Sequence, residues 1–246
     1  MDSLFPALNI FAILTGLITI LIVIRLYLQY RFKYLLTFAY NISLFNIVLI
    51  LFLPVNYLFG NSGVNFRQSF LILTILCVFL LSINILKYLW GYTFVLVIFQ
   101  VLNKNISKLV NRVFFIVSGI TLVVFTILFY FEPDGGSINY PMRITEIVTF
   151  QVLIAAYTAL IYFYFRSKKF ESGKRSKAVK MYSLPLIFIW SYVFITAVTG
   201  AFIRIPSLVE INIILVALSF NFVTAVILKS FVESYGDAER SEHQLT

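Results

Sequence analysis

Long apolar runs, separated by short polar connections, recur along the whole chain. Several exceed the roughly 20 residues that an α-helix needs to cross a hydrocarbon core about 30 Å thick. The apolar residues are continuous and do not alternate with polar ones as in the strands of a membrane β-barrel. The pattern predicts seven helices, at residues 4–27, 34–58, 68–90, 113–131, 143–165, 181–203 and 208–233. We therefore expect an all-α, polytopic membrane protein built as a seven-transmembrane-helix bundle.

The third apolar run continues beyond a single bilayer crossing. Its apolar residues extend past Lys87 to Leu102, and Trp90 and Tyr92 are typical of the membrane interface. We interpret residues 90–102 either as a tilted extension of the third helix or as a helix lying on the cytoplasmic surface. An eighth short span is the alternative, but it would disrupt the charge asymmetry of the connections that follow.

Positive charges concentrate in the connections after the first, third and fifth predicted helices. This set comprises Arg25, Arg31, Lys33, Lys87, Lys104, Lys108, Arg112, the basic residues of segment 166–180, and then Lys229 and Arg240. The other side has Arg67, Arg143 and Arg204, beside Asp2, Glu132, Asp134, Glu146 and Glu210. Because cytoplasmic connections carry the excess of Lys and Arg, the N-terminus is predicted outside and the C-terminus in the cytoplasm. The predicted location is the inner (plasma) membrane, crossed several times.

Composition agrees with a membrane protein. Hydrophobic residues make up 61% of the chain and charged residues 12%, against about 45–50% and about 25% in soluble domains. The net charge of +9 reflects the basic connections, so we expect segment 166–180 to lie near anionic lipid headgroups rather than to bind nucleic acid. Cys77 is the single cysteine, which excludes an intrachain disulfide.

Familiar catalytic constellations are missing from the sequence. The single histidine, His243, lies in the tail, so no His-based metal site is expected. Serine residues in the apolar runs have no activating base in view. Lys229 lies near the predicted cytoplasmic end of the seventh helix, whereas a retinal Schiff base would need a lysine midway along it. We therefore predict neither an enzyme nor a bound cofactor or metal.

Charged side chains cluster at the predicted outer ends of the last three helices. They are Arg143, Glu146, Arg204 and Glu210. Arg143 and Glu146 are three residues apart and share one helical face. The cluster could bind a polar ligand head or a lipid headgroup; the simpler interpretation is a set of ion pairs that fastens the helix ends at the interface.

A second set of polar residues lies deeper in the apolar runs. It comprises Asn41 and Asn46, then Thr74, Cys77 and Asn84, then Asn212, Ser219 and Asn221. Such side chains pair across membrane helices, so packing is one interpretation. A polar-lined cavity between the second, third and seventh helices is the other. The candidate ligand-binding residues of the two sets are Arg143, Glu146, Arg204, Glu210, Asn41, Asn84, Asn212 and Asn221.

The chain becomes polar after Lys229. We predict a seven-helix domain at residues 1–233 and a cytoplasmic tail at 234–246 that begins an output domain outside this chain. The first helix ends in a short basic turn and the chain re-enters the membrane at once, in the segment IRLYLQYRFKYLL at 24–36, and the chain closes on Leu245 and Thr246 after Tyr235 and Gly236. This layout resembles the seven-transmembrane N-terminal sensory regions of bacterial signalling proteins, those preceding LuxR-type helix-turn-helix regulators or histidine kinases.

The resemblance implies a receptor that signals through the seventh helix to a transcriptional output. The expected stimulus is a small apolar or amphipathic ligand, or the state of the bilayer. The alternatives are a small-molecule transporter or channel, and a structural protein whose polar groups serve packing. Predicted partners are the lipid bilayer, a small-molecule or lipid ligand and a second copy of the chain in a homodimer, whereas nucleic acid would be bound only through a domain outside this chain.

Overall fold

The structure is a computed structural model that describes residues 4–61, 70–101, 105–131 and 139–167. It also describes the separate residues 184, 187, 188, 191, 192, 195, 229, 230, 232 and 233. All regular secondary structure in this part of the chain is helical. The helices are α1 (Leu4–Tyr30), α2 (Lys33–Asn61), α3 (Phe70–Val101), α4 (Lys108–Phe131) and α5 (Asn139–Ser167). They correspond in order to the first five predicted helices.

Four of these helices are long and apolar enough to cross a membrane. The candidate spans are Ile10–Tyr30, Lys33–Leu51, Thr74–Val101 and Lys108–Phe129. In α5 the apolar part, Ile147–Tyr162, is shorter. The described residues of the sixth and seventh predicted helices are helical, but most of both helices and the tail at 234–246 lie outside the described residues. Seven spans and their orientation therefore stay predictions.

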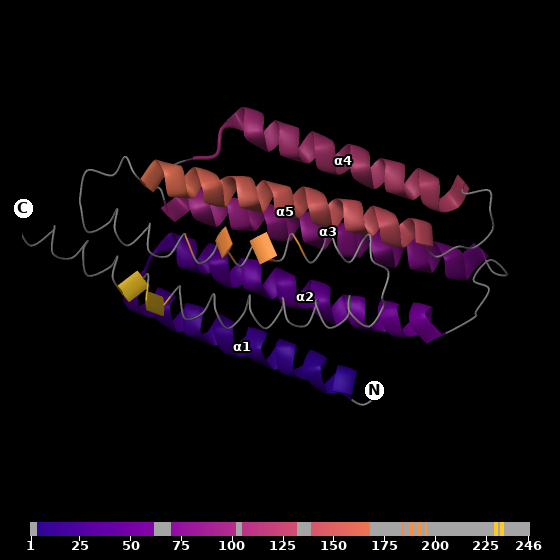
Figure 1. Cartoon of the computed structure of the whole chain (residues 1–246), viewed down its shortest axis with the longest axis horizontal. Coiled ribbons are helices and arrows are strands. Elements are labelled where there is room, and N and C mark those ends of the chain that lie inside the picture. The colour runs from indigo at the N-terminus through magenta and orange to yellow at the C-terminus, as the bar shows by residue number, and fades with distance from the viewer. Residues whose placement is uncertain are drawn as a thin grey trace, which may run out of the picture.

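The helices run up and down beside one another (Figure 1). In the described part of the chain, α2 packs between α1 and α3, α5 packs on α3, and α4 lies outside α3 and α5 with fewer contacts. The end of α1, the start of α2, the end of α3, the start of α4 and the end of α5 therefore meet at one end of the bundle (Figure 1). Arg31, Lys33 and Lys108 lie at this end, as the grouping of basic connections predicts.

A tight turn at Arg31 joins α1 to α2. Arg31 has a φ of 58°, in the left-handed region that usually holds Gly or Asn after a helix. Its backbone N–H donates to the carbonyl oxygen of Tyr27 at 2.8 Å, and its guanidinium lies 5.9 Å from the centre of the Tyr27 ring. This closure lets α2 begin after only Arg31 and Phe32.

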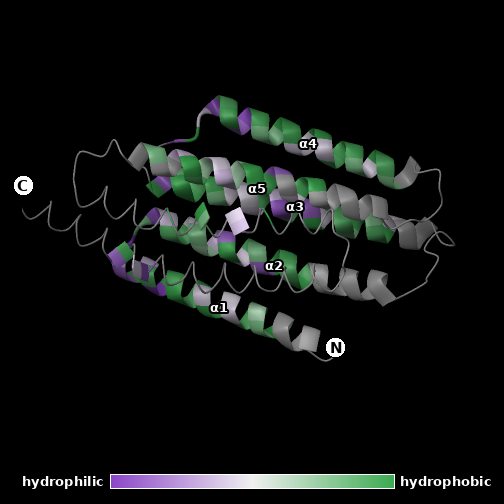
Figure 2. Ribbon diagram, in the orientation of Figure 1, coloured by the Kyte–Doolittle hydropathy of each residue, from purple (hydrophilic) through white to green (hydrophobic). Residues whose placement is uncertain are grey.

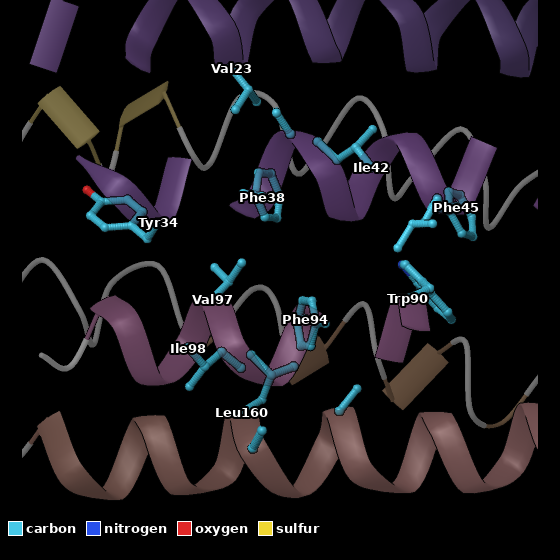
Figure 3. Close-up of a cluster of buried hydrophobic side chains, with 14 of the residues drawn as sticks. Val23, Tyr34, Phe38, Ile42, Phe45, Trp90, Phe94, Val97, Ile98 and Leu160 are labelled. Carbon is cyan, nitrogen blue, oxygen red and sulfur yellow. The ribbon is translucent and has the colours of Figure 1, made fainter. Parts of the chain in front are cut away.

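The largest apolar core lies between α1, α2, α3 and α5. Figure 3 shows Phe38 and Phe45 of α2 directed toward α3, where Phe94 and Trp90 lie. Ile42 lies on the other side of α2, and Leu160 of α5 lies on the far side of α3, next to Ile98. Outward-facing apolar residues such as Leu21 and Ile120 are exposed, as expected where lipid replaces protein contacts. Figure 2 shows that hydrophilic residues also occur within the length of α2 and α3, away from the helix ends.

Helix α3 is one continuous helix of 32 residues, about 48 Å long. The extension of the third helix through residues 90–101 is therefore confirmed, whereas the predicted end at residue 90 is wrong. Trp90, Phe94 and Val101 are buried in the core, which argues against a separate helix on the membrane surface. As a consequence Lys87 does not belong to a connection: it lies about 20 Å from either end of the span Thr74–Val101.

Two glycines allow neighbouring helices to approach closely. A Cβ added at Gly16 of α1 would lie 2.0 Å from Asn46 Oδ1 of α2. A Cβ added at Gly91 of α3 would lie 2.6 Å from Val152 Cγ1 of α5. Small residues at such contacts let membrane helices pack without a hydrophobic driving force. The α3–α5 contact at Gly91 brings polar residues of both helices within hydrogen-bonding distance.

Candidate polar site between helices α3, α4 and α5

Lys87 is the centre of the candidate site. Its ammonium Nζ donates a hydrogen bond to Thr149 Oγ1 of α5 at 2.9 Å. The other cations of the four candidate spans, Arg25, Lys33, Lys108 and Arg112, all lie within about one and a half turns of a span end. An ionisable side chain far inside a membrane span is costly and marks a candidate functional site. Lys87 is the one cation of these spans in that position.

A hydrogen-bond relay beside Lys87 joins three helices. Tyr88 of α3 is 5% exposed, and its hydroxyl donates to Gln151 Oε1 of α5. The amide Nε2 of Gln151 donates to Thr121 Oγ1 of α4 at 3.2 Å. Thr121 Oγ1 also donates to the carbonyl oxygen of Val117, one turn earlier in α4, at 3.0 Å. The position of α4 is thus coupled to the α3–α5 contact.

Asn84 lies one helical turn before Lys87 and Tyr88. Its side chain is completely buried, and neither its amide nitrogen nor its amide oxygen has a hydrogen-bond partner. A buried polar group without a partner costs about 1–3 kcal/mol. Gly91, seven residues after Asn84, packs on Val152 of α5, and residues at this spacing share a helix face. Asn84 therefore lies on the α5 side of α3 with two unused hydrogen-bonding atoms.

The early part of α5 contains two of the charged residues singled out from the sequence, Arg143 and Glu146. Glu146 is the single carboxylate residue in the sequences of α1 to α5. It lies one turn before Thr149, and Arg143 lies about one turn earlier still, in the early part of α5 where the sequence placed both. Their side chains lie outside the described part of the structure.

Asn41 belongs to a separate polar contact. Its amide Nδ2 donates to the carbonyl oxygen of Trp90 at 2.7 Å and to Thr93 Oγ1 at 2.8 Å, which fastens α2 to α3. Its amide oxygen has no partner. Thr93 follows Asn84 by nine residues, which places the two on opposite faces of α3. Asn41 and Asn84 are both fully buried, but α3 separates them.

Half of the residues singled out from the sequence cannot be placed. Arg204, Glu210, Asn212 and Asn221 lie outside the described residues, so a cavity that also involves the seventh helix stays a prediction. The structure adds members that sequence reasoning missed, namely Lys87, Tyr88, Thr121, Thr149 and Gln151. A lysine in the middle of an apolar run of 32 residues was the signal that could have found them.

The site is connected by packing to the C-terminal part of the chain. Val232 is completely buried and belongs to the same apolar cluster as Trp90 of α3 and Val148 and Val152 of α5. Val148 and Val152 flank Thr149 and Gln151 in α5. The part of α5 that carries Thr149 and Gln151 therefore packs in the same apolar core as Val232.

Comparisons with known proteins provide no further guide to the site. No protein family matches the chain, and no curated protein or solved structure is similar to it. Among the described residues, no three His, Cys, Asp or Glu side chains gather in a way that could hold a metal ion. The functional groups of this site lie within an apolar bundle. They are the ammonium of Lys87, the amides of Asn84 and Gln151, and the hydroxyls of Tyr88, Thr121 and Thr149.

Proposed function

We propose that this protein is a membrane-embedded sensory module whose polar site between α3, α4 and α5 responds to a small amphipathic or apolar ligand or to the state of the bilayer. The observation that carries the proposal is the position of Lys87, far inside α3 and bonded to Thr149, next to the unpartnered Asn84. In this proposal the chain crosses the plasma membrane seven times with its C-terminus in the cytoplasm.

Weak coupling between the helices suits a sensor. Hydrogen bonds between membrane helices contribute on average about 0.6 kcal/mol and at most about 2 kcal/mol. The bonds from Lys87 to Thr149 and from Gln151 to Thr121 can therefore be exchanged for bonds to a ligand at small cost. A ligand that binds one helix arrangement better than the other then shifts the population between them.

The shared core supports transmission to the cytoplasmic side. Val232 packs in the same cluster as Val148 and Val152, so a shift of α5 against α3 changes the surroundings of the C-terminal segment. Coupling between distant sites is carried by packed elements that have two arrangements. Residues 229–233 would pass the change to a cytoplasmic output of the transcription-regulator type.

A transporter or channel is the second candidate. Polar side chains lie on both faces of α3, with Asn41 on the α2 side and Asn84 on the α5 side. A row of such groups could line a path for a polar solute. The two candidates differ in solute flux. A transporter moves solute across the bilayer, whereas a sensor changes shape without moving solute.

A distance measurement between two helices tests the proposal. Spin labels are attached at Leu28 of α1 and Leu109 of α4, both exposed, after the buried Cys77 is replaced by alanine. The protein is placed in phosphatidylcholine vesicles, and hexadecanoic acid, hexadecanol, hexadecylamine or lipids of shorter chain length are added.

We expect at least one addition to change the distance between the labels, and the change to be absent in Asn84→Leu. Ser82→Ala, an exposed substitution on α3, serves as the matched control and should respond like the parent. Solute flux that depends on Lys87 would favour the transporter, and an unchanged distance under every condition would refute the sensory proposal.

A further inference from the structure

Helices α1 and α4 each carry an arginine on their exposed side. Figure 1 shows these helices at opposite edges of the described bundle, where α1 packs on α2 and α4 packs on α3 and α5. Arg25 is exposed in line with Leu21 and Leu28 of α1, which are also exposed. Arg112 is exposed beside Leu109 of α4 in the same way. Because residues three and four apart share a helix face, both arginines lie on surfaces that are otherwise apolar.

The two arginines lie at similar depths in the membrane spans. Arg25 precedes the end of the span Ile10–Tyr30 by five residues, about 7.5 Å, and Arg112 follows the start of the span Lys108–Phe129 by four residues, about 6 Å. The end of α1 and the start of α4 lie at the same end of the bundle (Figure 1). An arginine this close to a span end keeps its stem against apolar surface and extends its guanidinium into the headgroup layer.

Carboxylates do not neutralise these arginines from the same helices, because α1 to α4 contain no Asp or Glu. Further exposed cations lie at the same end of the bundle, namely Arg31 and Lys33 at the turn into α2 and Lys108 at the start of α4. Among the separately described residues near the C-terminus, Lys229 and Glu233 balance each other in charge. This end of α1 to α4 is therefore net positive and attracts anionic headgroups more than zwitterionic ones.

We infer that Arg25 and Arg112 each bind the phosphate group of an anionic phospholipid, whose acyl chains lie along the exposed apolar side of the same helix. A guanidinium presents its N–H donors in a planar fork that matches two phosphate oxygens. The bilayer supplies the phosphate, because the residues that adjoin each arginine on its helix face are apolar and lie within a membrane span. These lipid sites lie apart from the polar site at Lys87 and do not depend on the sensory proposal.

Fluorescence quenching close to each arginine tests the inference. In a Cys77→Ala background, Leu28→Cys or Leu109→Cys carries the fluorophore; both positions are exposed and lie three residues from Arg25 and Arg112 respectively. The full-length protein is placed in phosphatidylcholine vesicles that contain either phosphatidylglycerol or phosphatidylcholine with a nitroxide on the acyl chain near the headgroup. The ratio of the two quenching efficiencies at equal mole fraction measures the local preference for the anionic lipid.

We expect phosphatidylglycerol to be preferred at both labelled positions. Arg25→Gln should lower the preference at Leu28 about five-fold, which corresponds to about 1 kcal/mol, and leave the preference at Leu109 unchanged. Arg112→Gln should have the reverse effect, so the unaffected position reports that each variant is folded. Arg25→Lys should retain part of the preference because the charge remains. Gln29→Ala, an exposed and uncharged position near the same end of α1, should behave like the parent.

Three results would overturn the inference. Equal quenching by the two lipids at both positions would show that neither site selects an anionic headgroup. A preference that persists unchanged in both Arg25→Gln and Arg112→Gln would show that other cations cause it and that these arginines are not the contacts. Loss of the preference on addition of inorganic phosphate at constant ionic strength would show that the arginines bind a soluble anion rather than a lipid.

Discussion

The ammonium group of Lys87, within the candidate membrane span Thr74–Val101 of α3, donates a hydrogen bond to the hydroxyl of Thr149 in α5, 2.9 Å away. Thr149→Val removes the acceptor while keeping the shape of the side chain. We expect a loss of about 1–2 kcal/mol in the free energy of unfolding, measured in mixed micelles. In a double-mutant cycle with Lys87→Met, the coupling should be about 0.6–2 kcal/mol; strictly additive effects would show that the bond contributes nothing.

The two buried asparagines should respond in opposite ways to replacement by leucine. Asn41 donates two hydrogen bonds to α3, so Asn41→Leu should destabilise the protein by about 1–3 kcal/mol. Asn84 has no partner, so Asn84→Leu should leave the thermal unfolding temperature unchanged or raise it, because the cost of a buried unsatisfied amide disappears. Equal destabilisation by both substitutions would contradict the absence of a hydrogen-bond partner for the Asn84 amide.

A methyl group at Gly91 should disturb the α3–α5 contact. Because the added Cβ would lie 2.6 Å from Val152 Cγ1, we expect Gly91→Ala to cost about 1–3 kcal/mol. Gly119→Ala in α4 is the matched control: nothing lies within 4 Å of the added atom, and helix propensity favours alanine by up to about 1 kcal/mol. Unfolding temperatures of both variants test the contrast, and Gly91→Ala combined with Val152→Ala should recover part of the loss.

The turn at Arg31 gives a prediction about backbone strain. Arg31→Val and Arg31→Gly both remove the charge and the contact with the Tyr27 ring. At a φ of 58° a β-branched residue is strongly disfavoured and glycine is not. We expect Arg31→Val to be less stable than Arg31→Gly by about 1–2 kcal/mol. Equal unfolding temperatures for the pair would mean that the turn adopts another backbone conformation.

The sequence was informative about helices and much less so about the site. The first five helices follow from apolar runs because lipid requires every backbone group to be bonded within its own helix. The predicted end of the third helix was wrong because Lys87 and Trp90 look like residues of a membrane interface. Midway in α3, Thr149 of another helix accepts a hydrogen bond from the lysine. The sequence of one apolar run does not show which residues of another helix pack against it, so this contact could not be predicted.

The same limit applies to the asparagines. Asn41 and Asn84 were both singled out as interior polar residues, and both are fully buried. Their roles differ because α2 presents Asn41 to the backbone of Trp90, whereas the α5 side of α3 gives Asn84 no partner. Which face of a helix meets which neighbour depends on the packing order of the bundle, and that order is not encoded in the spacing of residues along one helix.

The loose packing of α4 has a consequence for how the bundle forms. Ile116, Ile120 and Ile127 are exposed on the outer side of α4. Because lipid would surround these side chains whether or not α4 is docked, burial of apolar surface contributes little to the association of α4 with α3 and α5. The relay from Thr121 to Gln151 and the hydrogen bond that Tyr92 donates to Asn111 Oδ1 at 3.3 Å connect it to its neighbours. We expect α4 to dock last after membrane insertion and to separate first when the bundle unfolds. During unfolding, a cysteine thiol placed on the inner side of α4 at Ser118 should therefore react with a thiol reagent before one placed at Ala156 in α5.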